Sequence, residues 1–93
     1  MGEAQRIGKT VVEKKLAACV NILRGGLESA YRWKGRVERA KEVLMIIKTT
    51  VGKLRELERE VKRMHSYDVP EFIVLPIVEG SREYLDWVQD SVR

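Results

Sequence analysis

Residues 42–50 read EVLMIIKTT, and this stretch decides the fold. Five successive apolar residues, Val43–Ile47, predict a strand over Glu42–Lys48 that is buried on both faces in the middle of a sheet. Thr49 and Thr50 then supply the N-cap of a helix of about four turns, because apolar residues recur after them at helical spacing. These residues are Val51, Leu54, Leu57, Val61 and Met64.

Upstream of this stretch, the sequence predicts a helix and a long β hairpin. Apolar residues recur at helical spacing from Gly2 to about Ala17, with charged residues between them. Residues 18–23 are apolar and partly β-branched, which predicts a strand that ends before the breaker at Gly25 and Gly26. A second extended run, 27–33, leads to a tight turn at 33–36, after which the chain returns.

Downstream, the pattern predicts a loop, a strand and a last helix. The loop covers His65–Pro70, because a proline disfavours helical conformation in the residue before it. Glu71–Val78 is predicted to be a strand with an edge or a bulge at Pro76, which has no N–H to donate. Ser81 is expected to cap the last helix.

The order helix, hairpin, helix, strand, helix predicts an α+β sandwich with the helices on one face of a mostly antiparallel sheet. The ferredoxin-like plan (strand, helix, two strands, helix, strand) fits if its first strand is missing from this chain. The length of 93 residues is that of a single domain, 1–93. Such a chain buries only roughly 60–65% of its unfolded surface, so oligomerisation or a metal is expected to add stability.

The composition is that of a globular protein with an ionic surface, since 44% of the residues are hydrophobic and 34% are charged. A single cysteine excludes an intrachain disulfide. No apolar run reaches the roughly 18–20 residues of a membrane span, and the first residues lack the apolar stretch of a signal peptide. We therefore expect a soluble, cytoplasmic protein that does not bind membranes.

The net charge of +4 is unevenly distributed along the chain. Residues 1–50 contain 11 Lys and Arg against 5 Asp and Glu, whereas residues 51–93 contain 7 against 9. Much of the excess lies in the first helix and in the segment with Arg32, Lys34, Arg36, Arg39 and Lys41. This charge indicates either a surface for anions or a solvated helix face and hairpin tip, and the second interpretation is favoured. We expect no nucleic-acid binding, because the central strand has no aromatic residues.

Few residues are candidates for catalysis or metal binding. Cys19 lies in an apolar stretch that favours burial over reactivity, and His65 fits a helix C-terminus. Cys19, His65 and Glu71 are metal ligands by type, but they differ in softness and have no characteristic spacing. The sequence contains no nucleophile elbow and no phosphate loop. An enzyme that uses His65 as a general base remains an alternative.

Several ordered motifs resemble those of the CutA family of divalent-cation-tolerance proteins, from about Glu3 to Val92. The most specific are LAACVNI at 16–22, YRWKGR at 31–36, IKT at 47–49, HSYDVPE at 65–71, and LP at 75–76 with YLDW at 84–87. The resemblance implies a ferredoxin-like fold, a homotrimer similar to PII-type signalling trimers, copper tolerance and no enzyme activity. It also implies an apolar strand ahead of the first helix, which this sequence lacks.

The resemblance further implies a ligand cleft between neighbouring subunits. Its residues here are Tyr31, Trp33, Lys48, His65, Tyr67, Glu71 and Trp87. In that cleft Lys48 is expected to bind an anionic group, Glu71 and His65 to act as acceptors or metal ligands, and the aromatic residues to form walls. The expected ligand is a small anion or a divalent cation such as Cu(II), with no required cofactor. A trimeric structural or partner-binding module without a metal site is the alternative.

Overall fold

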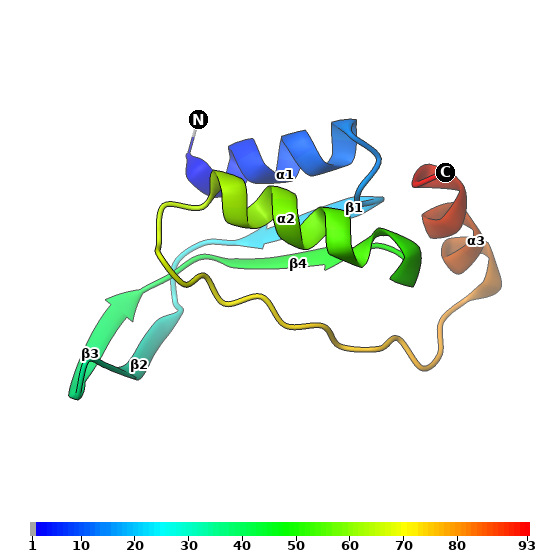
Figure 1. The fold of residues 1–93 in the computed structure, drawn as a ribbon. Helices are drawn as coiled ribbons and strands as arrows, with labels where there is room; N and C mark the ends of the chain where they lie inside the picture. The colour runs from blue at the N-terminus through cyan, green and yellow to red at the C-terminus, as the bar shows by residue number, and fades with distance from the viewer. Residues whose placement is uncertain (1) are drawn as a thin grey trace.

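A computed structural model describes residues 2–93 of the chain (Figure 1). Its helices are α1 (Glu3–Glu13), α2 (Leu54–Met64) and α3 (Arg82–Ser91), with a short 3-10 turn, η1 (Val51–Lys53), before α2. Its strands are β1 (Cys19–Leu23), β2 (Glu28–Trp33), β3 (Arg36–Lys41) and β4 (Leu44–Lys48). The predicted α+β fold class with antiparallel strands is confirmed. No helix in residues 2–93 is long and apolar enough to cross a membrane.

Two antiparallel strand pairs form the β structure. β1 pairs with β4 in a register that runs from Cys19 opposite Lys48 to Leu23 opposite Leu44. β2 pairs with β3, and their hairpin projects away from the rest of the chain (Figure 1). The two residues of its turn, Lys34 and Gly35, have φ angles of 50° and 78°. Positive φ at both central positions matches the right-handed twist of the strands, so the predicted tight turn is confirmed.

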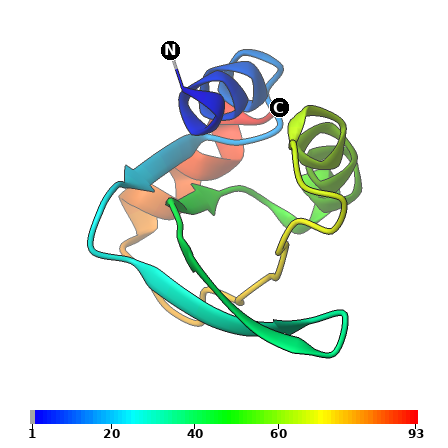
Figure 2. The same cartoon turned by 90° about the vertical axis from the view of Figure 1, so that its left-hand side faces the viewer.

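The core lies between the two long helices and the β1–β4 sheet. α1 and α2 contact each other and lie side by side over one face of the strands (Figures 1 and 2). The buried residues are Ile7 and Val11 of α1, Leu16 and Ala17 of the following turn, and Leu57 and Val61 of α2. Val20, Met45 and Ile47 of the sheet pack against them. The predicted position of the helices on one face of an antiparallel sheet is therefore confirmed.

The first helix is shorter than predicted. It ends at Glu13 rather than near Ala17, because Lys15 adopts a φ of 59°, which leaves the helical region. The N–H groups of Leu16 and Ala17 still donate to the carbonyl of Val11, so the buried turn follows the helix directly.

Neither Thr49 nor Thr50 caps the second helix with its side chain, although the sequence had predicted such a cap. Thr49 Oγ1 donates to the Leu16 carbonyl at 2.7 Å and so ties the end of β4 to the turn after α1. Thr50 occupies the N-cap position of η1 but makes no capping bond with its side chain. Ser81 does cap α3 as predicted, since its Oγ accepts the Tyr84 N–H at 3.3 Å. The last helix packs through Val88 and Val92 against Ala18.

The burial predicted for β4 is wrong on one face. Met45 and Ile47 face the helices, whereas Leu44 and Ile46 are 41% and 52% exposed. The physical reason is that β4 pairs only with β1, and no other part of residues 2–93 covers the face opposite the helices.

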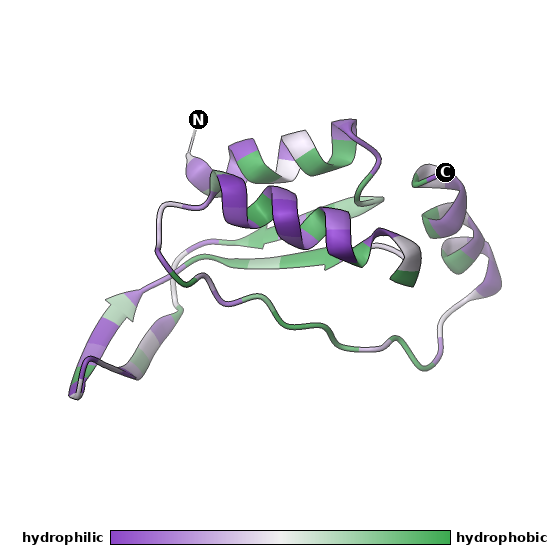
Figure 3. Cartoon of the chain, viewed as in Figure 1, coloured by the Kyte–Doolittle hydropathy of each residue, from purple (hydrophilic) through white to green (hydrophobic). Residues whose placement is uncertain are grey.

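The strand predicted at Glu71–Val78 is also wrong. The segment is extended and apolar (Figure 3), but it pairs with no strand of the described chain. Phe72 packs against the core, while Leu75 and Val78 are 81% and 93% exposed. A continuous apolar run predicts the extended backbone, but a strand also needs a hydrogen-bonded neighbour, which residues 2–93 do not provide here.

Candidate functional site

The residues predicted to form the ligand cleft lie on four separate parts of the chain. Tyr31 and Trp33 are on the projecting hairpin, Lys48 ends β4, and Trp87 is on α3. His65, Tyr67 and Glu71 belong to the connection that follows α2. The hairpin and α3 are at opposite ends of a molecule whose extents are 45 × 26 × 23 Å (Figure 1). One chain therefore does not bring the whole set together, and the cleft remains a prediction.

The structure does bring His65 and Tyr67 together. His65 is the C-cap of α2, and its backbone N–H donates to the Val61 carbonyl at 2.9 Å. Its Nδ1 accepts the Tyr67 N–H at 3.0 Å, and the two rings meet edge to face with centroids 4.7 Å apart. The N–H of Ser66 donates to Glu3 Oε1 of α1 at 3.1 Å. Two side-chain acceptors thus hold the turn that follows α2.

The hydrogen bond at Nδ1 determines what His65 can offer a ligand. A neutral imidazole has one nitrogen with a free lone pair, and the other carries the proton. Because Nδ1 accepts from Tyr67, Nε2 carries the proton and can donate to an anion. A metal bound at Nε2 would need the proton on Nδ1, which would then face the Tyr67 N–H. Metal binding at Nε2 of His65 therefore requires the hydrogen bond from the Tyr67 N–H to break.

Lys48 is held on the outer face of the sheet, away from the helices. Its Nζ donates to Asn21 Oδ1 and, at 3.4 Å, to the Ile46 carbonyl. Cys19 is opposite Lys48 in the β1–β4 register and is half-buried. Because Val20 and Ile47 pack into the core, the alternation of the strands places Cys19 and Lys48 on the opposite face.

The three residues predicted as metal ligands are not gathered by the chain. Cys19 is on β1, whereas His65 begins the connection after α2 and Glu71 lies six residues further along it. Across residues 2–93, no three His, Cys, Asp or Glu side chains lie close enough together to hold a metal ion. The metal set remains a prediction that would need groups from more than one chain.

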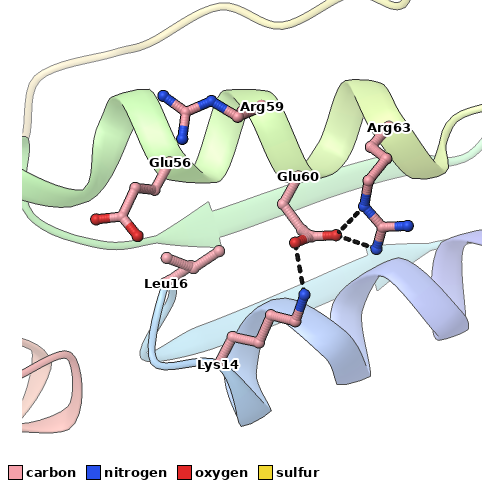
Figure 4. Close-up of a pocket in the computed structure, with 6 residues that line it drawn as sticks. All are labelled: Lys14, Leu16, Glu56, Arg59, Glu60 and Arg63. Atoms are coloured by element: carbon pink, nitrogen blue, oxygen red, sulfur yellow. Dashed lines mark hydrogen bonds and ion pairs between the residues drawn. The ribbon is translucent and has the colours of Figure 1, made fainter.

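One charged cluster was not predicted from the sequence. Glu60 of α2 accepts Lys14 Nζ at 2.7 Å through Oε2, and Arg63 Nε at 2.7 Å through Oε1 (Figure 4). The cluster lines a cavity of about 360 Å³ together with Leu16, Glu56 and Arg59. The hydrogen bond from Lys14, followed by that from Arg63, lowers the pKa of Glu60 below its usual value.

This cluster acts as a clamp between the end of α1 and the middle of α2. The Glu60 side chain is only 11% exposed, and both of its oxygens are occupied. Arg59 and Glu56 line the cavity, but their side chains point away from Glu60 (Figure 4). The i, i+3 spacing of Glu60 and Arg63 was readable from the sequence, whereas the Lys14 contact spans 46 positions and depends on the tertiary fold.

Comparisons with known proteins agree with the fold. The family described as "CutA1 divalent ion tolerance protein" matches residues 1–91. The chain is 50% identical over 88 residues to the divalent-cation tolerance protein CutA of Thermus thermophilus, which covers 95% of this chain and 84% of that protein.

Solved structures give the same result. The Thermus thermophilus Cut A1 structure matches with a TM-score of 0.94 at 48% identity and covers 98% of this chain and 87% of its own. A CutA from Archaeoglobus fulgidus, described as periplasmic, matches with a TM-score of 0.93 at 47% identity, over 98% and 87% of the two chains. A protein of Nostoc sp. described as PII-like CutA matches with a TM-score of 0.88 at 31% identity, over 98% and 88%.

Proposed function

The chain belongs to the CutA1 family of divalent ion tolerance proteins, and from this premise we propose that it acts as a homotrimer that binds a divalent cation or a small anion between its subunits. Its α+β, ferredoxin-like fold is that of the family. In this proposal the protein has a role in copper tolerance, binds rather than catalyses, and acts in the cytoplasm.

The observation that carries the proposal is the amount of apolar surface that a single chain leaves exposed. Leu44 and Ile46 on β4, the extended segment at 73–78 and the aromatic residues of the hairpin and α3 are all uncovered. Large apolar side chains left exposed in this number favour an interaction surface, because exposed apolar area is costly in water. A 93-residue chain with a small core gains stability from such an assembly.

The arrangement of the candidate cleft residues also favours an assembly. The hairpin with Tyr31 and Trp33 is at one end of the folded molecule, and α3 with Trp87 is at the other. These residues can therefore share a cleft only if different copies contribute them. His65 with a proton on Nε2 and Lys48 with its ammonium both favour an anionic group. Glu71, which is exposed, supplies a carboxylate for a hard cation.

A trimeric module without a metal site is the second candidate. The occupied Nδ1 of His65 favours it, because metal binding must break an existing hydrogen bond. So does the lack of a three-ligand cluster anywhere in residues 2–93.

Two measurements test these proposals. Light scattering on a sizing column at two protein concentrations is expected to give about 32 kDa, three times the chain mass of 10.8 kDa. Isothermal titration with Cu(II), and separately with citrate and inorganic phosphate, is expected to show binding that His65→Ala weakens. A monomeric mass would refute the trimer. A trimer that binds none of these probes would leave only the structural module.

A further inference from the structure

The face of the β1–β4 sheet opposite the helices carries a single charged side chain. We call it the outer face and define it by the residues that alternate with those packed in the core, which are Cys19, Asn21, Leu23, Leu44, Ile46 and Lys48. Lys48 is the only charged residue of the six. The three leucine and isoleucine side chains are between 41% and 57% exposed. The outer face is therefore an apolar surface with one cation at its edge.

Two uncharged acceptors hold the ammonium of Lys48 on this face. Its Nζ donates to Asn21 Oδ1 on the neighbouring strand and, at 3.4 Å, to the Ile46 carbonyl. An ammonium has three N–H donors, so one of them remains for a further acceptor. Within residues 2–93, no carboxylate pairs with Lys48. The positive charge is thus positioned but not neutralised.

Asn21 adds uncharged donors at the same place. Its amide oxygen faces the ammonium, because two donor groups cannot share a hydrogen bond. The amide nitrogen Nδ2 carries two N–H groups, and it donates to no group of the described chain. Asn21 was not predicted as a site residue, because its contact with Lys48 spans 27 positions of the sequence. The fold therefore places the free donors of an amide beside the free donor of an ammonium.

We propose that Lys48 and Asn21 together bind the carboxylate of a singly charged, otherwise apolar molecule. The proposal rests on the anion binding proposed above, and it adds a second ligand-binding residue and a ligand class. One ammonium matches one negative charge, and the two oxygens of a carboxylate can accept from Nζ and Nδ2 at once. Leu23, Leu44 and Ile46 supply the apolar lining that surrounds the few polar groups of a typical ligand site.

A multiply charged anion fits this face less well than a carboxylate. A phosphate group carries about −1.5 to −2 charges at pH 7, whereas the outer face offers one cation among apolar side chains. The surplus charge would lie against Leu44 and Ile46, where it loses water without gaining a partner. The outer face is therefore expected to bind a monocarboxylate more tightly than inorganic phosphate.

Titration of the assembled protein with benzoate tests the proposal. Benzoate has one carboxylate on an apolar ring, and benzamide is its uncharged analogue of similar shape. Benzoate is expected to shift the NMR signals of the Asn21 side-chain amide, a group that only direct contact or a change at Lys48 perturbs. Benzamide is expected to bind at least about tenfold more weakly, because it lacks the charge that pairs with the ammonium.

The variant Asn21→Asp separates ligand binding from support of the fold. Aspartate keeps an acceptor for the Lys48 ammonium but replaces the amide donors by a negative charge. The melting temperature should stay the same or rise, whereas the Kd of benzoate should rise at least about tenfold. Lys48→Gln, which removes the cation, should also raise this Kd. Gln89→Glu makes the same change of charge on an exposed amide of α3 and should leave the Kd unchanged within about twofold.

The outcomes distinguish this site from the broader function. Benzoate binding that neither Asn21→Asp nor Lys48→Gln weakens, or that leaves the wild-type Asn21 amide signals unmoved, overturns the carboxylate site. A trimer that binds citrate, phosphate or Cu(II) but not benzoate also overturns it, and the function proposed above then stands. A protein that binds none of these probes overturns both the proposed ligand binding and the carboxylate site.

Discussion

Gly8 of α1 lies against Val20 of β1 so closely that a Cβ atom at residue 8 would be 3.3 Å from Val20 Cγ1. The helix approaches the sheet at this point because glycine has no side chain. Gly8 and the neighbouring Ile7 are buried, and Val20 packs against the core, so neither side can move freely.

This contact gives a first prediction. Gly8→Ala adds helix propensity of up to about 1 kcal/mol but forces an overpacked contact that costs about 1–3 kcal/mol. We expect a net loss of stability, measured by urea unfolding. In a Val20→Ala background, where the contact is relieved, the same Gly8→Ala change is expected to stabilise the chain relative to that background. The same sign in both backgrounds would contradict the steric account.

The Glu60 clamp gives a prediction about pH. The pKa of Glu60 is lowered in the folded chain, so the carboxylate contributes stability above its unfolded value, near 4.5. This contribution is lost as the pH falls through the lower folded value. Glu60→Gln is therefore expected to lower the melting temperature at pH 7, and the difference from wild type should shrink as the pH falls below about 4.

Glu58→Gln is the matched control for this experiment. Among the described residues 2–93, Glu58 pairs only with Lys62, one turn later on the same helix, and its side chain is more exposed than that of Glu60. Its loss should change the melting temperature less, because exposed i, i+4 pairs contribute little. Equal effects of the two substitutions would remove the special role of the clamp.

Lys15 gives a prediction about backbone strain. Its φ of 59° lies in the left-handed region, which costs a residue with a Cβ roughly 1 kcal/mol. Lys15→Gly is expected to stabilise the chain by up to about 1 kcal/mol in urea unfolding. Lys9→Gly, in the middle of α1, is expected to destabilise it by a similar amount. Destabilisation by both substitutions would argue that Lys15 has another role in the turn.

The turn at His65 gives a prediction about metal binding. If Cu(II) coordinates His65, the Nδ1 acceptor is disturbed and the Tyr67 N–H loses its hydrogen bond. Hydrogen exchange of the Tyr67 amide should then become several-fold faster on Cu(II) addition, while the His65 amide, which donates to Val61, stays protected. Copper binding with an unchanged Tyr67 amide would place the metal elsewhere.

The local elements of the fold were largely predictable from the sequence. The apolar run at 43–47 marked β4, the spacing of Leu57 and Val61 marked α2, and Ser81 marked the start of α3. Each of these signals comes from neighbouring residues, because strand alternation, helix period and capping act over a few positions. The family motifs were equally readable, and they led to the family that the comparisons establish.

What the sequence determined by itself was therefore the order and type of most elements and the residue types of a candidate site. The tertiary structure alone decided that Glu71–Val78 has no strand partner within residues 2–93 and that Lys14 meets Glu60. It also decided that β2, with Trp33, and α3, with Trp87, are at opposite ends of the molecule. The physical reason is that local periodicity fixes the conformation and face of each segment. Pairing, burial and proximity depend on which distant segments the folded chain places beside one another.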